Sequence, residues 1–130
     1  MPALVSWSLE NLSSDSLAST LSSGDIEVIC GDGREGHAPS APYDAIHVGA
    51  AAPTIPQALI DQLKSPGRML IPVGTSSQQI ILVDKDGEGK VTQKSALDVV
   101  VSVQLRCPDL ISVDTLFVTR ALLIIHIPVF

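Results

Sequence analysis

The sequence predicts an α/β fold, and two observations carry that prediction. Ala45 to Val48 form a short apolar run between Pro-Tyr-Asp and Gly-Ala-Ala-Ala-Pro, which is typical of a strand buried in a parallel sheet. Residues 45–74 then follow the order strand, helix, strand, which indicates a βαβ unit with parallel strands. Because ligands of open α/β sheets bind outside the carboxyl ends of the strands, we expect the small residues after Val48 to form the floor of a site.

The N-terminal part of the chain predicts a helix, a linker and a strand. Residues 4–12 place apolar side chains on one helical face. The Ser-rich residues 13–23 predict a linker, with a further helical turn as the alternative. Residues 25–30 alternate and then become apolar, which predicts a strand that ends in Cys30, a small core residue. Residues 31–42 are rich in Gly, Pro and Ala and predict a loop.

The middle of the chain completes the predicted sheet. Residues 54–64 predict the clearest helix, because Thr54 can cap its first turn and its apolar residues share one face: Ile55, Leu59, Ile60 and Leu63. Residues 68–74 predict a second buried strand. Residues 79–83 and 90–103 predict a C-terminal antiparallel strand pair, because a Gly- and Asp-rich turn separates them.

The last residues, 105–130, are strongly apolar but are interrupted by Arg120, His126 and Pro128. The uninterrupted run is shorter than the roughly 20 residues that span a bilayer. We therefore expect a buried strand or an aggregation-prone end here, and no membrane partner.

Length, charge and cysteine content exclude several classes of function. A chain of 130 residues holds one domain. Its net charge of −6 argues against a nucleic-acid partner, which would need a basic face. Cys30 and Cys107 are too few for a disulfide framework or a zinc site. The first residues lack the positive charge of a signal peptide, so we expect a cytoplasmic protein, and a monomer.

Gly31 to Gly36 spell G-x-G-x-x-G directly after the predicted strand at residues 25–30. A dinucleotide-binding site needs a helix to open at this motif, and Pro39 and Pro42 prevent it. An Asp-Gly pair is also an ordinary turn former. The alternative is that the Asp32 carboxylate accepts a hydrogen bond from an exocyclic amine, such as that of adenine, beside a backbone N–H.

His47 lies in a predicted buried strand, where a structural histidine is the simpler interpretation than a catalytic one. The chain contains no Ser/His/Asp arrangement with a nucleophile elbow, no phosphate loop and no metal-ligand spacing. No metal site and no catalytic residue are therefore assigned.

Four segments together resemble the protein-L-isoaspartate O-methyltransferases: residues 32–36, 41–53, 55–64 and 67–74. The resemblance runs from about Leu4 to about Val101. It implies a Rossmann-like fold that uses S-adenosylmethionine to methylate the free carboxylate of isoaspartyl residues in damaged proteins and peptides. The acceptor carboxylate, with a reference pKa of about 3.3 to 3.9, is already ionised at neutral pH and needs no general base.

The resemblance also implies site residues. Those expected near the cofactor are Asp32, Gly33, Arg34, His47, Val48 and Gly49. Those expected near the acceptor substrate are Ala50, Ala51, Ala52 and Pro53.

The family pattern is incomplete in this sequence. The family's first two strands, which separate the strand at 25–30 from that at 45–48, have no counterpart, and neither does the glycine-rich loop that grips the cofactor's methionine part. We therefore expect residues 1–104 to form a partial methyltransferase domain without activity, and residues 105–130 to be a divergent tail. The two flanking strands must re-pair, helped by this tail, or the chain does not fold independently. The alternative function is a non-catalytic fragment that acts as an interaction or aggregation-prone module.

Overall fold

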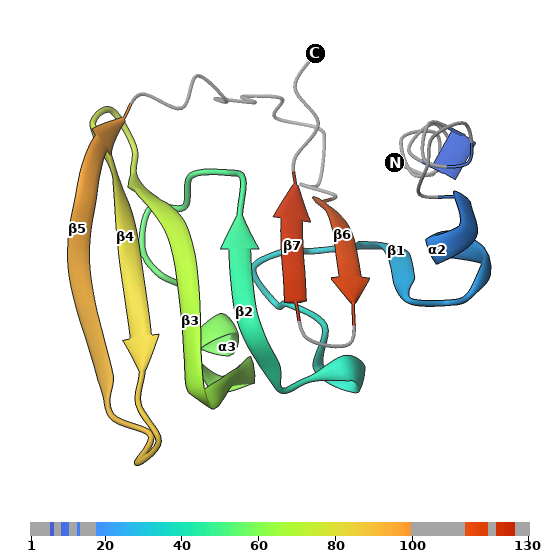
Figure 1. The fold of residues 1–130 in the computed structure, drawn as a ribbon. Helices are drawn as coiled ribbons and strands as arrows, with labels where there is room; N and C mark the ends of the chain where they lie inside the picture. The colour runs from blue at the N-terminus through green and yellow to red at the C-terminus, as the bar shows by residue number, and fades with distance from the viewer. Residues whose placement is uncertain are drawn as a thin grey trace.

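The computed structural model describes residues 18–99, 114–119 and 122–126, with residues 6, 9, 10 and 13 as isolated positions before them. The strands within these ranges form one sheet in the order β1-β6-β7-β2-β3-β4-β5 (Figure 1). Their bounds are β1 Ile26–Gly31, β2 Tyr43–Val48, β3 Leu63–Gly74, β4 Gln78–Lys85, β5 Val91–Val99, β6 Asp114–Thr119 and β7 Leu122–His126. The helices are α2 Ala18–Ser22, the short 3₁₀ turn η1 Ala38–Ser40, and α3 Gln57–Gln62.

The predicted βαβ unit is present. β2 and β3 pair in parallel, with Ile46 opposite Met69, and α3 connects them. α3 is shorter than the predicted 54–64, because Pro56 is its N-cap and contributes no capping side chain. The helix ends where Leu63 adopts an extended backbone and begins β3. Thr54 therefore lies outside the helix that it was expected to cap.

Lys85 at the end of β4 fixes the junction between α3 and β3. Its amine donates to the carbonyl of Ile60 at 3.1 Å and to that of Leu63 at 2.8 Å. The last carbonyls of a helix have no partner within the helix, and a cation there also interacts favourably with the helix dipole. Lys85 thus holds the end of the short helix against the sheet.

The core lies where α3 packs on the central strands. Leu59 is the buried residue of α3 and is 1% exposed. The fully buried side chains are Tyr43, Ile46, Leu59, Leu63, Met69, Ile71 and Val83. β4 and β5 form the predicted antiparallel pair. Residues 100–103, which were expected to extend that pair, lie outside the described residues.

Two burial predictions are wrong. His47, expected in a strand buried on both faces, is exposed, whereas Ile46 and Val48 are buried. Alternate side chains of a strand point to opposite faces, and only one face of β2 is packed against α3 among the described elements (Figure 1). Cys30, expected in the core, is also exposed, because β1 is the outermost strand of its side of the sheet.

The N-terminal elements are partly described. The predicted helix at 4–12 lies mostly outside the described residues, although positions 6, 9 and 10 are helical. Within the predicted linker, residues 18–22 form α2, so the alternative of a further helical turn is confirmed there. No described helix is long and apolar enough to cross a bilayer.

The tail supplies the two strands between β1 and β2. β7 lies parallel to β2, with Val48 opposite Ile125, and antiparallel to β6. β6 in turn pairs antiparallel with β1, with Ile29 opposite Leu116. β1 and β2 therefore run in the same direction without pairing with each other. The expected help from the tail takes the form of the antiparallel strands β6 and β7, which stand between β1 and β2.

We predict that Ile124→Pro in β7 releases β1 while leaving β3 and β4 folded. Proline removes a backbone donor from a strand that has partners on both sides. Amide hydrogen exchange should accelerate at those residues of β1 whose N–H faces β6, and exchange at Leu70 and Leu82 should not change.

Ile124→Val keeps the backbone N–H and serves as the control for that substitution. If the amides of β1 remain protected in Ile124→Pro, the hairpin is not what holds β1 in the sheet.

Candidate functional site

The predicted site residues lie at the carboxyl ends of two strands of the same direction. Asp32 and Gly33 follow β1, and Gly49 follows β2. β6 and β7 stand between these two strands, and the loop after β1 contacts Gln62 and Tyr43, which lie at the amino ends of β3 and β2.

A tight turn follows β1. The backbone N–H of Glu35 donates to the Asp32 carbonyl at 3.0 Å, and that of Gly36 donates to the Gly33 carbonyl at 3.2 Å. Gly33 is buried, and Gly36 has φ +65°, a conformation that glycine adopts without strain. The Asp-Gly pair thus forms the turn that the simpler interpretation predicts, and it also ends at the site edge.

The Asp32 carboxylate is bound by Arg34. Arg34 donates to it from its backbone N–H at 3.0 Å, from Nε at 2.9 Å and from Nη2 at 2.6 Å. These side-chain hydrogen bonds from Arg34 lower the pKa of Asp32. Arg34, expected to bind the cofactor, contacts Asp32 in this structure and keeps its carboxylate ionised.

Two residues that the sequence did not single out hold the loop after this turn. The carboxamide of Gln62 donates from Nε2 to the Glu35 carbonyl at 2.7 Å and accepts at Oε1 from the His37 N–H at 2.8 Å. The Tyr43 hydroxyl donates to the His37 carbonyl at 2.6 Å. The sequence carries no local signal for these contacts, because Gln62 lies 25 residues beyond His37.

The segment after β2 turns across the end of β3. Ala52 donates its N–H to the Pro72 carbonyl at 3.1 Å and accepts from the Gly74 N–H at 2.9 Å. Ala50 is buried and Pro53 is exposed. The small residues 49–52 thus form a backbone-rich ledge at the carboxyl edge, as expected of a site floor.

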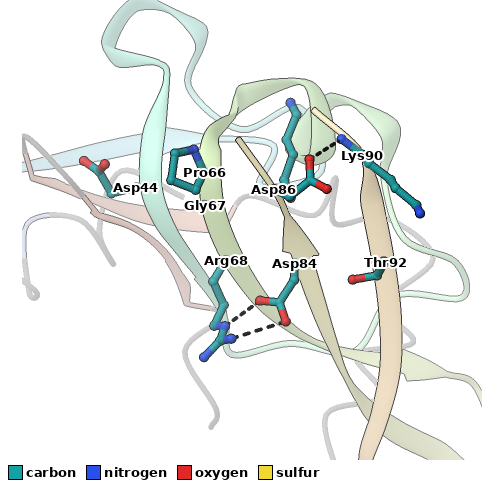
Figure 2. Close-up of a pocket in the computed structure, with 9 residues that line it drawn as sticks. Asp44, Pro66, Gly67, Arg68, Asp84, Asp86, Lys90 and Thr92 are labelled. Carbon is teal, nitrogen blue, oxygen red and sulfur yellow. Dashed lines mark hydrogen bonds and ion pairs between the residues drawn. The ribbon is translucent and has the colours of Figure 1, made fainter. Parts of the chain in front are cut away.

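A cavity of about 480 Å³ opens at the opposite edge of the sheet (Figure 2). It lies beside the first residues of β2 and the last residues of β4, and its lining residues are Asp44, Pro66, Gly67, Arg68, Asp84, Lys85, Asp86, Lys90 and Thr92. This edge holds the amino ends of the parallel strands, whereas ligands of α/β sheets bind at the carboxyl ends. The cavity is therefore not the predicted site.

Charged groups in that cavity already have partners within the chain. Arg68 forms two hydrogen bonds with the Asp84 carboxylate, at 2.6 and 3.2 Å (Figure 2). Lys64 pairs with Asp44 at 2.6 Å. Asp86 accepts backbone N–H bonds of the turn that joins β4 and β5. Most charged side chains that line the cavity thus have a partner within the chain.

The described part of the chain contains no group of three or more His, Cys, Asp or Glu side chains that could hold a metal ion.

Comparison with known proteins identifies the family. The model of the protein-L-isoaspartate(D-aspartate) O-methyltransferase family matches residues 1–105. The chain belongs to this family. Protein-L-isoaspartate O-methyltransferase 1 of Arabidopsis thaliana is 50% identical over 99 residues, which cover 76% of this chain and 43% of that protein. The Caenorhabditis elegans enzyme is 46% identical over 96 residues, or 72% of this chain and 42% of its own length.

The chain therefore spans less than half the length of these relatives. This chain is also similar to a crystal structure of a Plasmodium falciparum protein-L-isoaspartate O-methyltransferase in complex with S-adenosyl-L-homocysteine. The sequence identity is 31%, and the match covers 48% of this chain and 28% of the Plasmodium chain, with a TM-score of 0.42. Members of the family are S-adenosylmethionine-dependent methyltransferases. The mixed sheet with few helices agrees with a partial Rossmann-like fold.

The residues of this methyltransferase-family chain fit one half of the cofactor. Asp32 presents an ionised carboxylate whose side chain is 28% exposed, and Gly33 adds no side chain beside it. A carboxylate can accept from an exocyclic amine, but both oxygens of Asp32 already accept from Arg34 in this structure. At the other half, Gly49 to Ala52 offer backbone and methyl groups but no charged side chain for the cofactor's amino-acid end.

We predict that Arg34→Gln raises the pKa of Asp32. Arg34 stabilises the ionised form of Asp32, so the pKa of this group is lower in the folded chain than in the unfolded one. The pair therefore stabilises the fold above the unfolded-state pKa of about 3.9. This contribution is lost as the pH falls through the folded-state pKa. The carboxyl carbon shift of Asp32, followed by NMR, measures the change.

Arg68→Gln is the matched control for Arg34→Gln, because it removes the corresponding pair with Asp84. It should raise the pKa of Asp84 and leave that of Asp32 unchanged. An unchanged Asp32 titration in Arg34→Gln would contradict the assignment.

We also predict that Tyr43 ionises at a higher pH than an exposed tyrosine, and that its ionisation is coupled to alkaline unfolding. Tyr43 is fully buried, and burial raises the pKa of its phenol. The unfolded chain releases this proton near pH 10 while the folded chain keeps it, so stability falls as the pH rises further.

Tyr43 is the single tyrosine of the chain, so tyrosinate absorbance reports this residue directly. Tyr43→Phe should lower the free energy of unfolding by about 0.5 to 1.5 kcal/mol at neutral pH, because the hydrogen bond to the His37 carbonyl is lost. Between pH 9 and about 11, the urea midpoint of this variant should fall less than that of the unsubstituted chain. Tyrosinate formation near pH 10 in the folded chain would contradict burial of the phenol.

Proposed function

We propose that this chain carries the adenosine-side and acceptor-side elements of a protein-L-isoaspartate O-methyltransferase. The reaction is the transfer of a methyl group from S-adenosylmethionine to the free carboxylate of isoaspartyl residues in damaged proteins. The family match over residues 1–105 is the observation that carries this proposal. The position of Asp32 and Gly33 directly after β1, and of Gly49 directly after β2, supports it.

The residues present suit a reaction that works by positioning. The acceptor carboxylate is ionised at neutral pH, with a reference pKa of about 3.3 to 3.9, and needs no base. S-Adenosylmethionine supplies the electrophilic methyl group when bound. Holding the two reactants in line contributes on the order of 7 to 11 kcal/mol to the acceleration. In this proposal Asp32 and Gly33 face the adenine, and His47 to Pro53 lie near the methyl group and the acceptor.

We further propose that these 130 residues alone do not catalyse the transfer. In the proposed arrangement, residues 1–104 are a partial methyltransferase domain that lacks the family's first two strands, and residues 105–130 are a divergent tail. β7 lies beside β2, at the place where the family resemblance puts the first strand and its glycine-rich loop.

A non-catalytic interaction or aggregation-prone module is the second candidate function. It would depend on the apolar tail being available to a partner. β6 and β7 are interior strands of the sheet and not edge strands. This position favours a role for the tail within the fold.

The test is a methyl-transfer assay with a tritiated cofactor and an isoaspartyl peptide. We expect no turnover above background and weak binding of S-adenosylmethionine by calorimetry, because the amino-acid end of the cofactor finds no charged partner. A full-length relative serves as the positive control, and the same peptide with normal aspartate is the negative one. Turnover, or tight cofactor binding, by the chain alone would overturn the proposed inactivity.

A further inference from the structure

We propose that Gln62 is a positioning residue for the turn of residues 32–36. Its carboxamide holds this turn in the conformation that presents Asp32 and Gly33 at the carboxyl end of β1. The proposal rests on the proposed function only in naming adenosine as the group that the turn presents.

The two halves of the Gln62 carboxamide satisfy two backbone groups of the same loop. Nε2 donates to the Glu35 carbonyl at 2.7 Å, and Oε1 accepts from the His37 N–H at 2.8 Å. Both distances are typical of good hydrogen bonds. Because a carboxamide carries one donor end and one acceptor end, the pair of contacts fixes both the position and the orientation of residues 35–37.

Gly36, between these two residues, provides an independent observation. Its φ of +65° turns the backbone toward Gln62, and a Cβ placed at Gly36 would lie 2.4 Å from Oε1 of Gln62. The loop therefore approaches the carboxamide more closely than a residue with a side chain allows. Glycine at this position suits both the positive φ of the turn and the two hydrogen bonds that Gln62 makes with the neighbouring residues.

The location of Gln62 explains why its contacts matter to the site. It is the last residue of α3, directly before Leu63, which is 1% exposed and begins β3. β1 itself shares no ladder with β2 or β3. The Gln62 contacts therefore tie the turn after β1 directly to the βαβ unit, across the part of the sheet where β6 and β7 intervene.

The test compares Gln62→Leu, Gln62→Glu and the control Gln57→Leu by amide hydrogen exchange. Gln57 lies on the same helix and bonds to the side chain of Asp61. We expect the amides of Glu35, Gly36 and His37 to exchange about tenfold faster in Gln62→Leu, as for the loss of a hydrogen bond, with the amides of β3 and β4 unchanged.

Gln62→Glu separates a positioning role from general packing. Glutamate keeps an acceptor for the His37 N–H but has no donor for the Glu35 carbonyl. His37 should therefore stay protected while Glu35 and Gly36 exchange faster. Equal protection of residues 35–37 in Gln62→Leu and in the unsubstituted chain would overturn the proposal.

An adenosine titration by NMR completes the test. We expect Gln62→Leu to weaken adenosine binding about tenfold and Gln57→Leu to leave it unchanged. If the unsubstituted chain binds no adenosine, the proposed adenine site is wrong, while the exchange data still decide whether Gln62 holds the turn. Unchanged adenosine affinity in a Gln62→Leu variant with a released turn would overturn the link between the Gln62 contacts and the site.

Discussion

The ladder that joins β1 to β2 through β6 and β7 is the constraint on which the rest of the structure depends. β1 carries the Asp32 turn, and β6 is its ladder partner among the described strands. β7 supplies the parallel neighbour that β2 would otherwise lack on that side. Backbone groups of interior strands must be paired, so β6 and β7 decide how β1 and β2 are spaced within the sheet.

The site edge is stabilised by contacts that span long stretches of sequence. Asp32 is bound locally by Arg34, whereas the following residues are held by Gln62 from α3 and by Tyr43 from β2. On the other side, Ala52 is fixed by the backbone of β3. Backbone groups on both sides of the proposed site are thus held by hydrogen bonds from other parts of the chain.

Much of the fold follows from local patterns. The apolar run at 45–48, the helix face around Leu59 and the strand at 68–74 were predictable because periodicity and turn formers specify them within a few residues. The family motifs in these same segments made the family predictable as well. Burial was less predictable: His47 and Cys30 are exposed because burial depends on which face of a strand another element covers.

The sequence by itself thus determined the βαβ unit, the antiparallel pair after it and the Asp-Gly turn, since each depends on neighbouring residues. Only the tertiary structure decided the strand order. An apolar segment such as Leu122–His126 can pair with any open strand edge, and its partner depends on which edges the remaining chain leaves free. The same holds for Gln62, whose role appears only when the fold brings residue 62 beside residues 35 and 37.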